Sequence, residues 1–170
     1  MNPTEWLLES LDEAFDRPSW HGTNLRGSLR GVKPAEALWR PAPGRHNIWE
    51  IVLHTAYWKY RVRRRLLGEK QGSFVLAGNN WFERSDGLSS QLWRREIGLL
   101  EAEHRQLREA VLSLTAADLD KPAGGDRYRV RQLIRGGAAH DLYHAGQIQL
   151  LKRLLRNGPP SEIPGPSGPE

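Results

Sequence analysis

The sequence of 170 residues predicts an all-α protein, a four-helix bundle with long crossover connections. Four long segments carry apolar residues at the 3.6-residue spacing of an amphipathic helix, and little of the chain alternates as strands do. The connections between these segments are long, which favours crossovers over a simple up-down-up-down order. The four segments are residues 4–15, 47–68, 88–114 and 130–156.

The first two helices have recognisable ends. In the first, Leu7, Leu8, Leu11, Ala14 and Phe15 form one apolar face, and Pro18 stops the helix. The second helix begins after Asn47, a good N-cap, and Glu50 three residues later completes a capping-box pattern. Gly68 is the expected stop of this helix.

The connecting segments are read from their glycine and proline content. Residues 19–46 are rich in both, and the sequences at 28–31 (SLRG) and 34–40 (PAEALWR) each predict a short helical turn. Residues 69–86 lack a sustained period and predict a long connection, and residues 121–126 predict a turn. Residues 1–156 are therefore expected to form a single domain, followed by a Pro/Gly-rich tail at 157–170.

The composition is that of a soluble globular protein, with 38% hydrophobic and 26% charged residues. The chain has no cysteine, which excludes disulfides, thiolate catalysis and cysteine-ligated metals, and leaves imidazole and carboxylate as metal ligands. No signal peptide is recognisable, and no apolar run approaches the roughly 20 residues of a membrane span. We therefore expect a cytoplasmic protein that does not bind membranes.

A net charge of +5 raises the question of nucleic-acid binding. The densest basic run comprises Lys59, Arg61, Arg63, Arg64, Arg65 and Lys70. We interpret this run as the solvated face and C-terminal end of a helix, where cations also favour the helix dipole. No helix-turn-helix, zinc finger or RNA-binding motif accompanies it, so nucleic acid is not the expected partner.

Three histidines lie on the apolar faces of predicted helices. His140 and His144 are one turn apart in the last helix, and His54 occupies an inward position in the second. A buried imidazole needs polar partners, so these residues are either satisfied core histidines or ligands of one divalent metal ion. Three protein ligands with an open position are typical of catalytic zinc sites.

The other histidines and the acidic residue beside His140 are expected to be peripheral. His104 is predicted to be a surface residue of the third helix. His21 and His46 lie in loops, with no role assigned beyond proximity to a pocket mouth. Asp141 points away from the inward face, where an ion pair with a neighbouring arginine is expected.

Several further polar residues have two possible roles. Glu96 and Glu103 lie near the inward side of the third helix and either orient a ligand histidine or a metal-bound water, or pair with Arg95 or Arg105, which is the favoured interpretation. Gln147 is expected to bond a metal-bound water or the neighbouring helix.

Three glycines, at positions 136, 137 and 146, lie on or beside the inward side of the last helix. Glycine inside a helix costs about 1 kcal/mol relative to alanine, so some gain should offset it. Close approach of a neighbouring helix or room for a ligand are the two candidate gains.

Two motifs resemble the DinB-like (DinB/YfiT-like) superfamily of metal-dependent four-helix proteins. The first is the run HDLYHAGQI from His140 to Ile148, and the second is His54 within NIWEIVLHTAYW. The loop sequence SWHGTNL and the helix order are also similar, so that the resemblance covers residues 4–156. The pair Gly136 and Gly137 departs from the pattern and weakens the expectation of a straight helix before His140.

The resemblance implies a bundle, usually dimeric, that binds one divalent metal through His54, His140 and His144. Some relatives are S-transferases that use bacillithiol, mycothiol or a similar thiol, and others look like metal-dependent hydrolases. We therefore expect a homodimeric metalloenzyme that activates a low-molecular-weight thiol or water for a small-molecule substrate. Zinc or nickel are the expected metals, with iron or cobalt as alternatives. The alternative function is a metal-binding scaffold or stress-related interaction protein without catalysis.

Overall fold

The computed structural model describes residues 2–69, 72–85, 89–124 and 127–158. These residues form helices and connections without a strand, apart from one isolated bridge between Pro122 and Arg129. The predicted all-α fold is confirmed. Lys70 of the basic run, the expected helix start at residue 88 and the tail after residue 158 lie outside the described residues. No helix in the described ranges has both the length and the apolarity needed to cross a bilayer.

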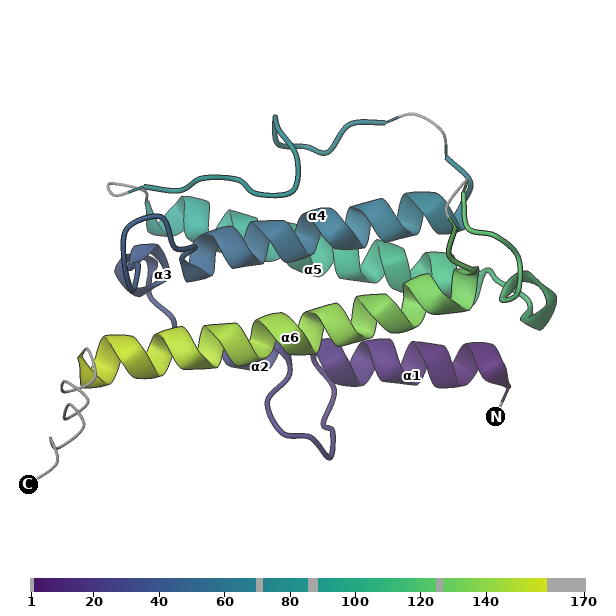
Figure 1. Cartoon of the computed structure of the whole chain (residues 1–170), viewed down its shortest axis with the longest axis horizontal. Helices are drawn as coiled ribbons and strands as arrows, with labels where there is room; N and C mark the ends of the chain where they lie inside the picture. Colours follow the sequence, from purple (N-terminus) through teal and green to yellow (C-terminus); the bar gives the residue numbers. More distant parts are fainter. Residues whose placement is uncertain (1, 70–71, 86–88, 125–126, 159–170) are drawn as a thin grey trace, which may run out of the picture.

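The long helices are α1 (Pro3–Phe15), α4 (Ile48–Leu66), α5 (Ser90–Leu112) and α6 (Val130–Asn157). α4 packs against α5 and α6, and α1 packs against α6 and α5, which makes a four-helix arrangement (Figure 1). α4 and α5 run in the same direction, so the connection between them returns along the length of α4 (Figure 1). The expected long crossover is therefore present.

The ends of the helices follow from local hydrogen bonds. The side chain of Asn47 accepts the Glu50 N–H at 2.9 Å, which confirms the predicted cap of α4. Gly68 has a φ of +67°, a left-handed conformation that favours glycine and stops the helix as expected. α1 starts one residue earlier than predicted, because Asn2 and Glu5 form a second capping box.

Two short helices lie in the first connection, α2 (Leu25–Ser28) and α3 (Pro34–Leu38). The second confirms the turn expected at 34–40. The first is displaced from the expected position at 28–31, because Asn24 caps it by accepting the Gly27 N–H at 2.8 Å. A short 3₁₀ turn, η1 (Ala116–Asp118), follows α5.

α4 is the central helix and is buried on nearly every side. Its polar residues are therefore inside the bundle, and the interpretation of residues 59–65 as a solvated face is wrong for Lys59 and Arg64. Arg64 donates to the Gly72 carbonyl at 3.2 Å and to the Glu69 carboxylate at 3.2 Å. These bonds tie the start of the crossover to the end of α4.

A charged network lies between α1, α4, α5 and α6. Lys59 forms an ion pair with Asp141, and the two side chains are only 3% and 1% exposed. Lys59 also donates to His104 Nδ1 at 3.4 Å, which leaves the proton of that ring on Nε2, 3.7 Å from Asp12 Oδ1. His104 stacks on Phe15 with 3.8 Å between ring centroids.

This network corrects two predictions. His104 is buried rather than at the surface, because α5 packs against both α4 and α1 and hides a wide arc. Asp141 does form an ion pair, but it lies inside the bundle and its partner is a lysine. Burial raises the pKa of Asp141, and the Lys59 ammonium opposes that rise.

The Lys59–Asp141 pair generates a stability prediction. Asp141→Leu alone should lower the free energy of unfolding by about 3–5 kcal/mol, because it leaves the Lys59 ammonium buried without a counter-charge. The double variant Lys59→Met/Asp141→Leu should recover most of that loss, since no charge remains buried. Urea unfolding of the metal-free protein measures both. Equal losses in the single and double variants would contradict this account.

His104 generates a pH prediction. Burial, followed by the charges of Lys59, Arg108 and Arg105, lowers its pKa from 6.5 to about 2. Below pH 6.5 the unfolded chain takes up a proton that the folded chain does not, so stability should fall by roughly 2 kcal/mol between pH 6.5 and pH 5 from this residue. His104→Phe, which keeps the stacking on Phe15, should reduce the fall in the free energy of unfolding between pH 6.5 and pH 5 by this amount. Urea unfolding at several pH values measures it, and the same pH dependence in the variant and the wild type would refute the prediction.

Candidate metal centre

The structure brings the three predicted histidines together. His54 comes from α4, and His140 and His144 come from adjacent turns of α6. The Nε2 atom of His140 lies 3.1 Å from the Nε2 of His54 and 3.1 Å from the Nε2 of His144. One nitrogen from each ring lies within 4.8 Å of the others, and this group is able to hold a metal ion.

Two of the rings are held by a hydrogen bond at their second nitrogen. His54 Nδ1 lies 2.8 Å from the Asn80 carbonyl oxygen, and His144 Nδ1 lies 2.7 Å from Gln147 Oε1. Both oxygens are acceptors, so both rings carry their proton on Nδ1 and present an unprotonated Nε2 to the centre. Gln147 therefore orients His144, a role that differs from the two expected for it.

The protein alone cannot satisfy the facing nitrogens. His54 and His144 both offer a lone pair to the Nε2 of His140, which carries at most one proton. One of the two 3.1 Å contacts is then a contact between lone pairs. A cation at the centre accepts all three lone pairs at once, so the donor set fits a divalent metal.

Protonation does not resolve this conflict. Burial lowers the pKa of all three histidines, to about 3 for His140 and about 4 for His144. Burial is the largest cause of each shift, and the nearby imidazoles contribute to the lowered pKa of His140. At neutral pH the rings are uncharged, which is the form that coordinates metal.

The crossover between α4 and α5 supplies the support of His54. Asn80 has a φ of +60°, a conformation that asparagine tolerates better than most residues, and the Trp81 N–H donates to the Asn79 carbonyl at 2.7 Å around it. This tight turn directs the Asn80 carbonyl at His54, and the Asn80 side chain accepts the Trp58 Nε1–H at 2.9 Å.

Trp81 is stacked between two histidines. Its ring lies 3.9 Å from that of His54 and 3.6 Å from that of His46, and both pairs are nearly parallel. His46 Nδ1 lies 3.0 Å from a carboxylate oxygen of Glu50. His46 therefore supports the centre through Trp81, a role that the sequence analysis did not assign to either residue.

Glu50 holds the segments on either side of this stack. Its buried carboxylate accepts bonds from Arg40 and from the Arg84 N–H. Burial alone would raise the pKa of Glu50, but these bonds and the one from His46 outweigh it and lower the pKa. The helix cap predicted at Glu50 is thus also the anchor of residues 40–46 and 84.

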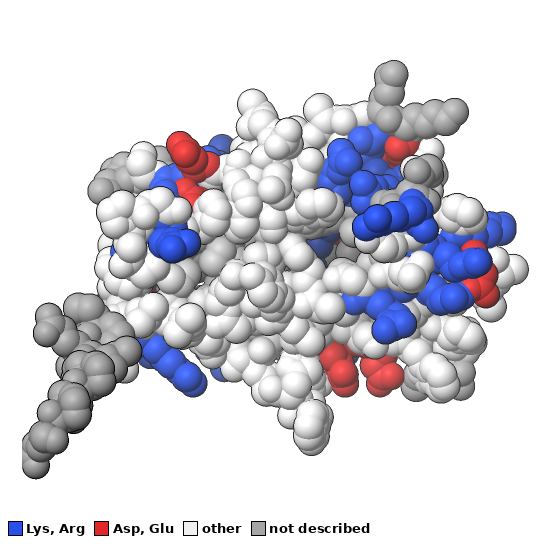
Figure 2. Space-filling view, viewed as in Figure 1, with Lys and Arg blue, Asp and Glu red and all other residues white. Residues whose placement is uncertain are grey.

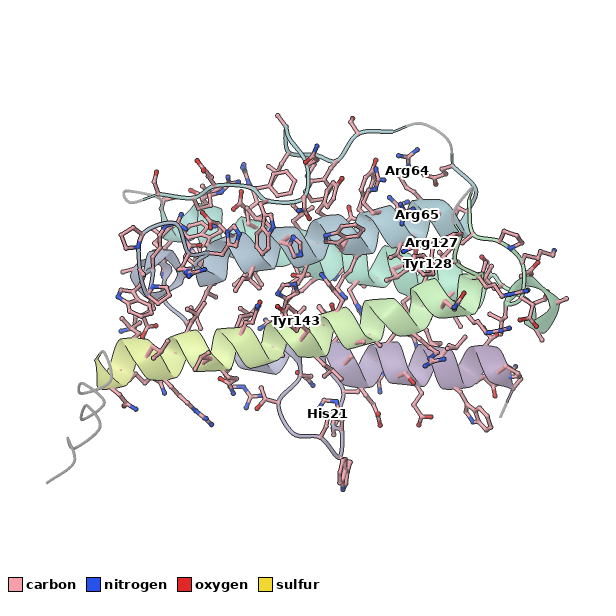
Figure 3. All side chains as sticks on the ribbon, viewed as in Figure 1. His21, Arg64, Arg65, Arg127, Tyr128 and Tyr143 are labelled. Carbon is pink, nitrogen blue, oxygen red and sulfur yellow. The ribbon has the colours of Figure 1, made fainter. Side chains whose placement is uncertain are left out.

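Three other predicted residues do not reach the centre. Glu96 accepts bonds from Trp49 Nε1 and from the Arg84 guanidinium, and Glu103 lies 3.8 Å from Arg63. Both pair with arginines, as the favoured interpretation expected, but inside the bundle and with arginines other than Arg95 and Arg105. His21 is exposed on the loop after α1, which projects from the bundle (Figure 3), and it does not belong to the three-histidine group.

A cavity of about 670 Å³ adjoins the three histidines. Its wall includes all three of them, together with His46, Trp81 and Gln147. Among the described residues the metal-binding group contains no fourth histidine, aspartate or glutamate. The arrangement is therefore an open three-histidine site with room for a small molecule, as in catalytic zinc sites.

A sequence model of the DinB superfamily matches residues 7–148, which include all three histidines. The chain belongs to the DinB superfamily. This confirms the family that the sequence motifs predicted. In this DinB superfamily protein α6 is continuous through Gly136 and Gly137, so the glycine pair does not break the helix that carries His140 and His144. No curated protein and no solved structure matches the chain.

Proposed function

We propose that this member of the DinB superfamily is a metal-dependent enzyme of the transferase or hydrolase type, with His54, His140 and His144 as the metal ligands. The observation that carries the proposal is the pair of unprotonated nitrogens facing His140 beside an open cavity. Three imidazoles suit zinc or nickel, and also iron or cobalt.

A divalent ion in such a site lowers the pKa of a coordinated water to about 7 or deprotonates a coordinated thiol. The chain has no cysteine of its own, so a thiol nucleophile would have to come from a small molecule. Asn80 and Gln147 keep two imidazoles in the metal-binding tautomer, and Trp81 shields His54 from water. Arg45 lies on the cavity wall and suits a thiol that carries a carboxylate.

The alternative is a metal-binding scaffold without catalysis. A scaffold calls for a site closed by a fourth protein ligand. The three-membered group and the cavity of about 670 Å³ favour the enzyme. A homodimer, implied by the family resemblance, is part of the proposal.

Metal content is the first test. Purified protein should carry about one divalent ion per chain after reconstitution, and His54→Ala, His140→Ala and His144→Ala should each lose it, because two imidazoles bind far more weakly than three. Inductively coupled plasma mass spectrometry measures the content. His21→Ala is the matched control, since His21 is exposed outside the centre. A wild type that binds no stoichiometric metal would refute the ligand assignment.

A transfer assay tests the reaction type. Metal-loaded protein should accelerate the attack of at least one small thiol on 1-chloro-2,4-dinitrobenzene, in which the C–S bond forms, chloride leaves and the thiol proton is released. His140→Ala should reduce the rate by about 100-fold or more, because a bound metal stabilises the transition state by several kcal/mol. His21→Ala should leave the rate unchanged.

The same preparation is then tested on activated esters. Ester hydrolysis without thiol transfer would assign the water-activating type. Absence of both activities in protein that holds its metal would contradict the enzyme and leave the scaffold.

A further inference from the structure

A second cavity, of about 560 Å³, lies between α4, α5 and α6. Along α6 it lies on the N-terminal side of the histidine cavity, and His140 is the described residue that lines both. Its apolar walls include Trp58, Val62, Leu107 and Leu133. A cavity of this size and apolar character is in the range that binds small organic molecules.

The charges inside this cavity neutralise each other. Lys59 and Asp141 line it, but they are paired with one another and almost fully buried. A ligand therefore needs no charge on the part that enters, and an apolar body suits the walls.

The mouth of the cavity is basic. Its exposed lining residues include Tyr128, Gln132 and Gly136, and Arg65 lies beside them. Arg127 donates to the Tyr128 hydroxyl at 2.6 Å and its guanidinium lies 4.8 Å from the centre of that ring. Among the described residues no carboxylate pairs with Arg127.

The figures place this charge on one face. Lys and Arg gather over the C-terminal end of α4 and the start of α6, with few acidic residues between them (Figure 2). Arg65, Arg127 and Tyr128 are seen near the C-terminal end of α4 and the start of α6 (Figure 3), where Arg65 and Tyr128 line the cavity and Arg127 contacts Tyr128. A positive rim around an apolar cavity is complementary to a molecule with one anionic end.

The two glycines at the cavity are not required by helix packing. A Cβ at position 136 would meet no atom within 4 Å, and one at 137 would make an ordinary contact with Leu11 at 3.6 Å. Close approach of a neighbour is therefore excluded at 136, and a side chain added there would stand at the open mouth of the cavity.

We propose that this cavity binds an amphipathic organic anion, with its apolar body between α4 and α6, its anionic end at Arg127, and its inner end beside His140. The proposal goes beyond the metal-dependent activity, because the cavity is formed by the protein alone. If the proposed function and this anion site are both correct, the bound anion contacts His140, one of the proposed metal ligands.

The test uses two fluorescent probes that share an aromatic scaffold. 8-Anilinonaphthalene-1-sulfonate is anionic, and N-phenyl-1-naphthylamine lacks the sulfonate. Wild-type protein, metal-free and metal-loaded, should bind the anionic probe at one saturable site and more tightly than the neutral one. Gly136→Leu should weaken the anionic probe by about tenfold or more, because the side chain obstructs the mouth.

Gly146→Leu is the matched control. Gly146 is also exposed on α6, a Cβ added there would meet no atom within 4 Å, and the residue lines neither cavity. This variant should bind like wild type, and circular dichroism should find both variants folded. Arg127→Gln should weaken the anionic probe by about threefold and leave the neutral probe unchanged.

Three results would overturn the proposal: no saturable binding to wild type, equal binding by Gly136→Leu and Gly146→Leu, or equal affinity for the charged and neutral probes. These readouts need neither metal nor turnover. They therefore stand or fall separately from the metal content and the transfer assay that test the proposed function.

Discussion

The structure depends on the burial of α4. This helix is enclosed by α5, α6 and the crossover, yet it carries Glu50, His54, Lys59 and Arg64 inside the bundle. A buried polar group without a partner costs roughly 1–3 kcal/mol, and a charged one costs more. Each of these four side chains must therefore find its partner on another element, and the path of the rest of the chain follows from that need.

The partners come from segments that are far apart in the sequence. Glu50 binds Arg40 and the Arg84 N–H, His54 binds the Asn80 carbonyl, and Lys59 binds Asp141. The connection between α4 and α5 has no periodic pattern, but the bonds of Asn80 to His54 and of Arg84 to Glu50 hold it along α4. Its conformation at Asn80 then determines which nitrogen of His54 faces the centre. The support of the candidate metal site is thus the same set of contacts that stabilises the central helix.

His140 links the two cavities because of its place on α6. His54 and His144 are each held by a hydrogen bond at Nδ1, whereas His140 has no bond at Nδ1 to a described residue. It is the least constrained of the three histidines and also the one shared by both cavity walls. A molecule in either cavity therefore meets the same ring.

Local rules and periodicity were sufficient for the helices and for the three histidines. The Asn47 cap, the Gly68 stop and the spacing of His140 and His144 are properties of short stretches, and His54 lies on the apolar face of its own helix. His104 also lies on an apolar face, between Leu100 and Leu107, and that spacing would have predicted its burial. The i,i+3 spacing of His144 and Gln147 within α6 is likewise a local property. The roles of Asn80, Trp81 and Arg84, in contrast, were decided only by the tertiary structure. They act through contacts between segments, and a contact across the bundle leaves no periodic trace in the sequence of either partner.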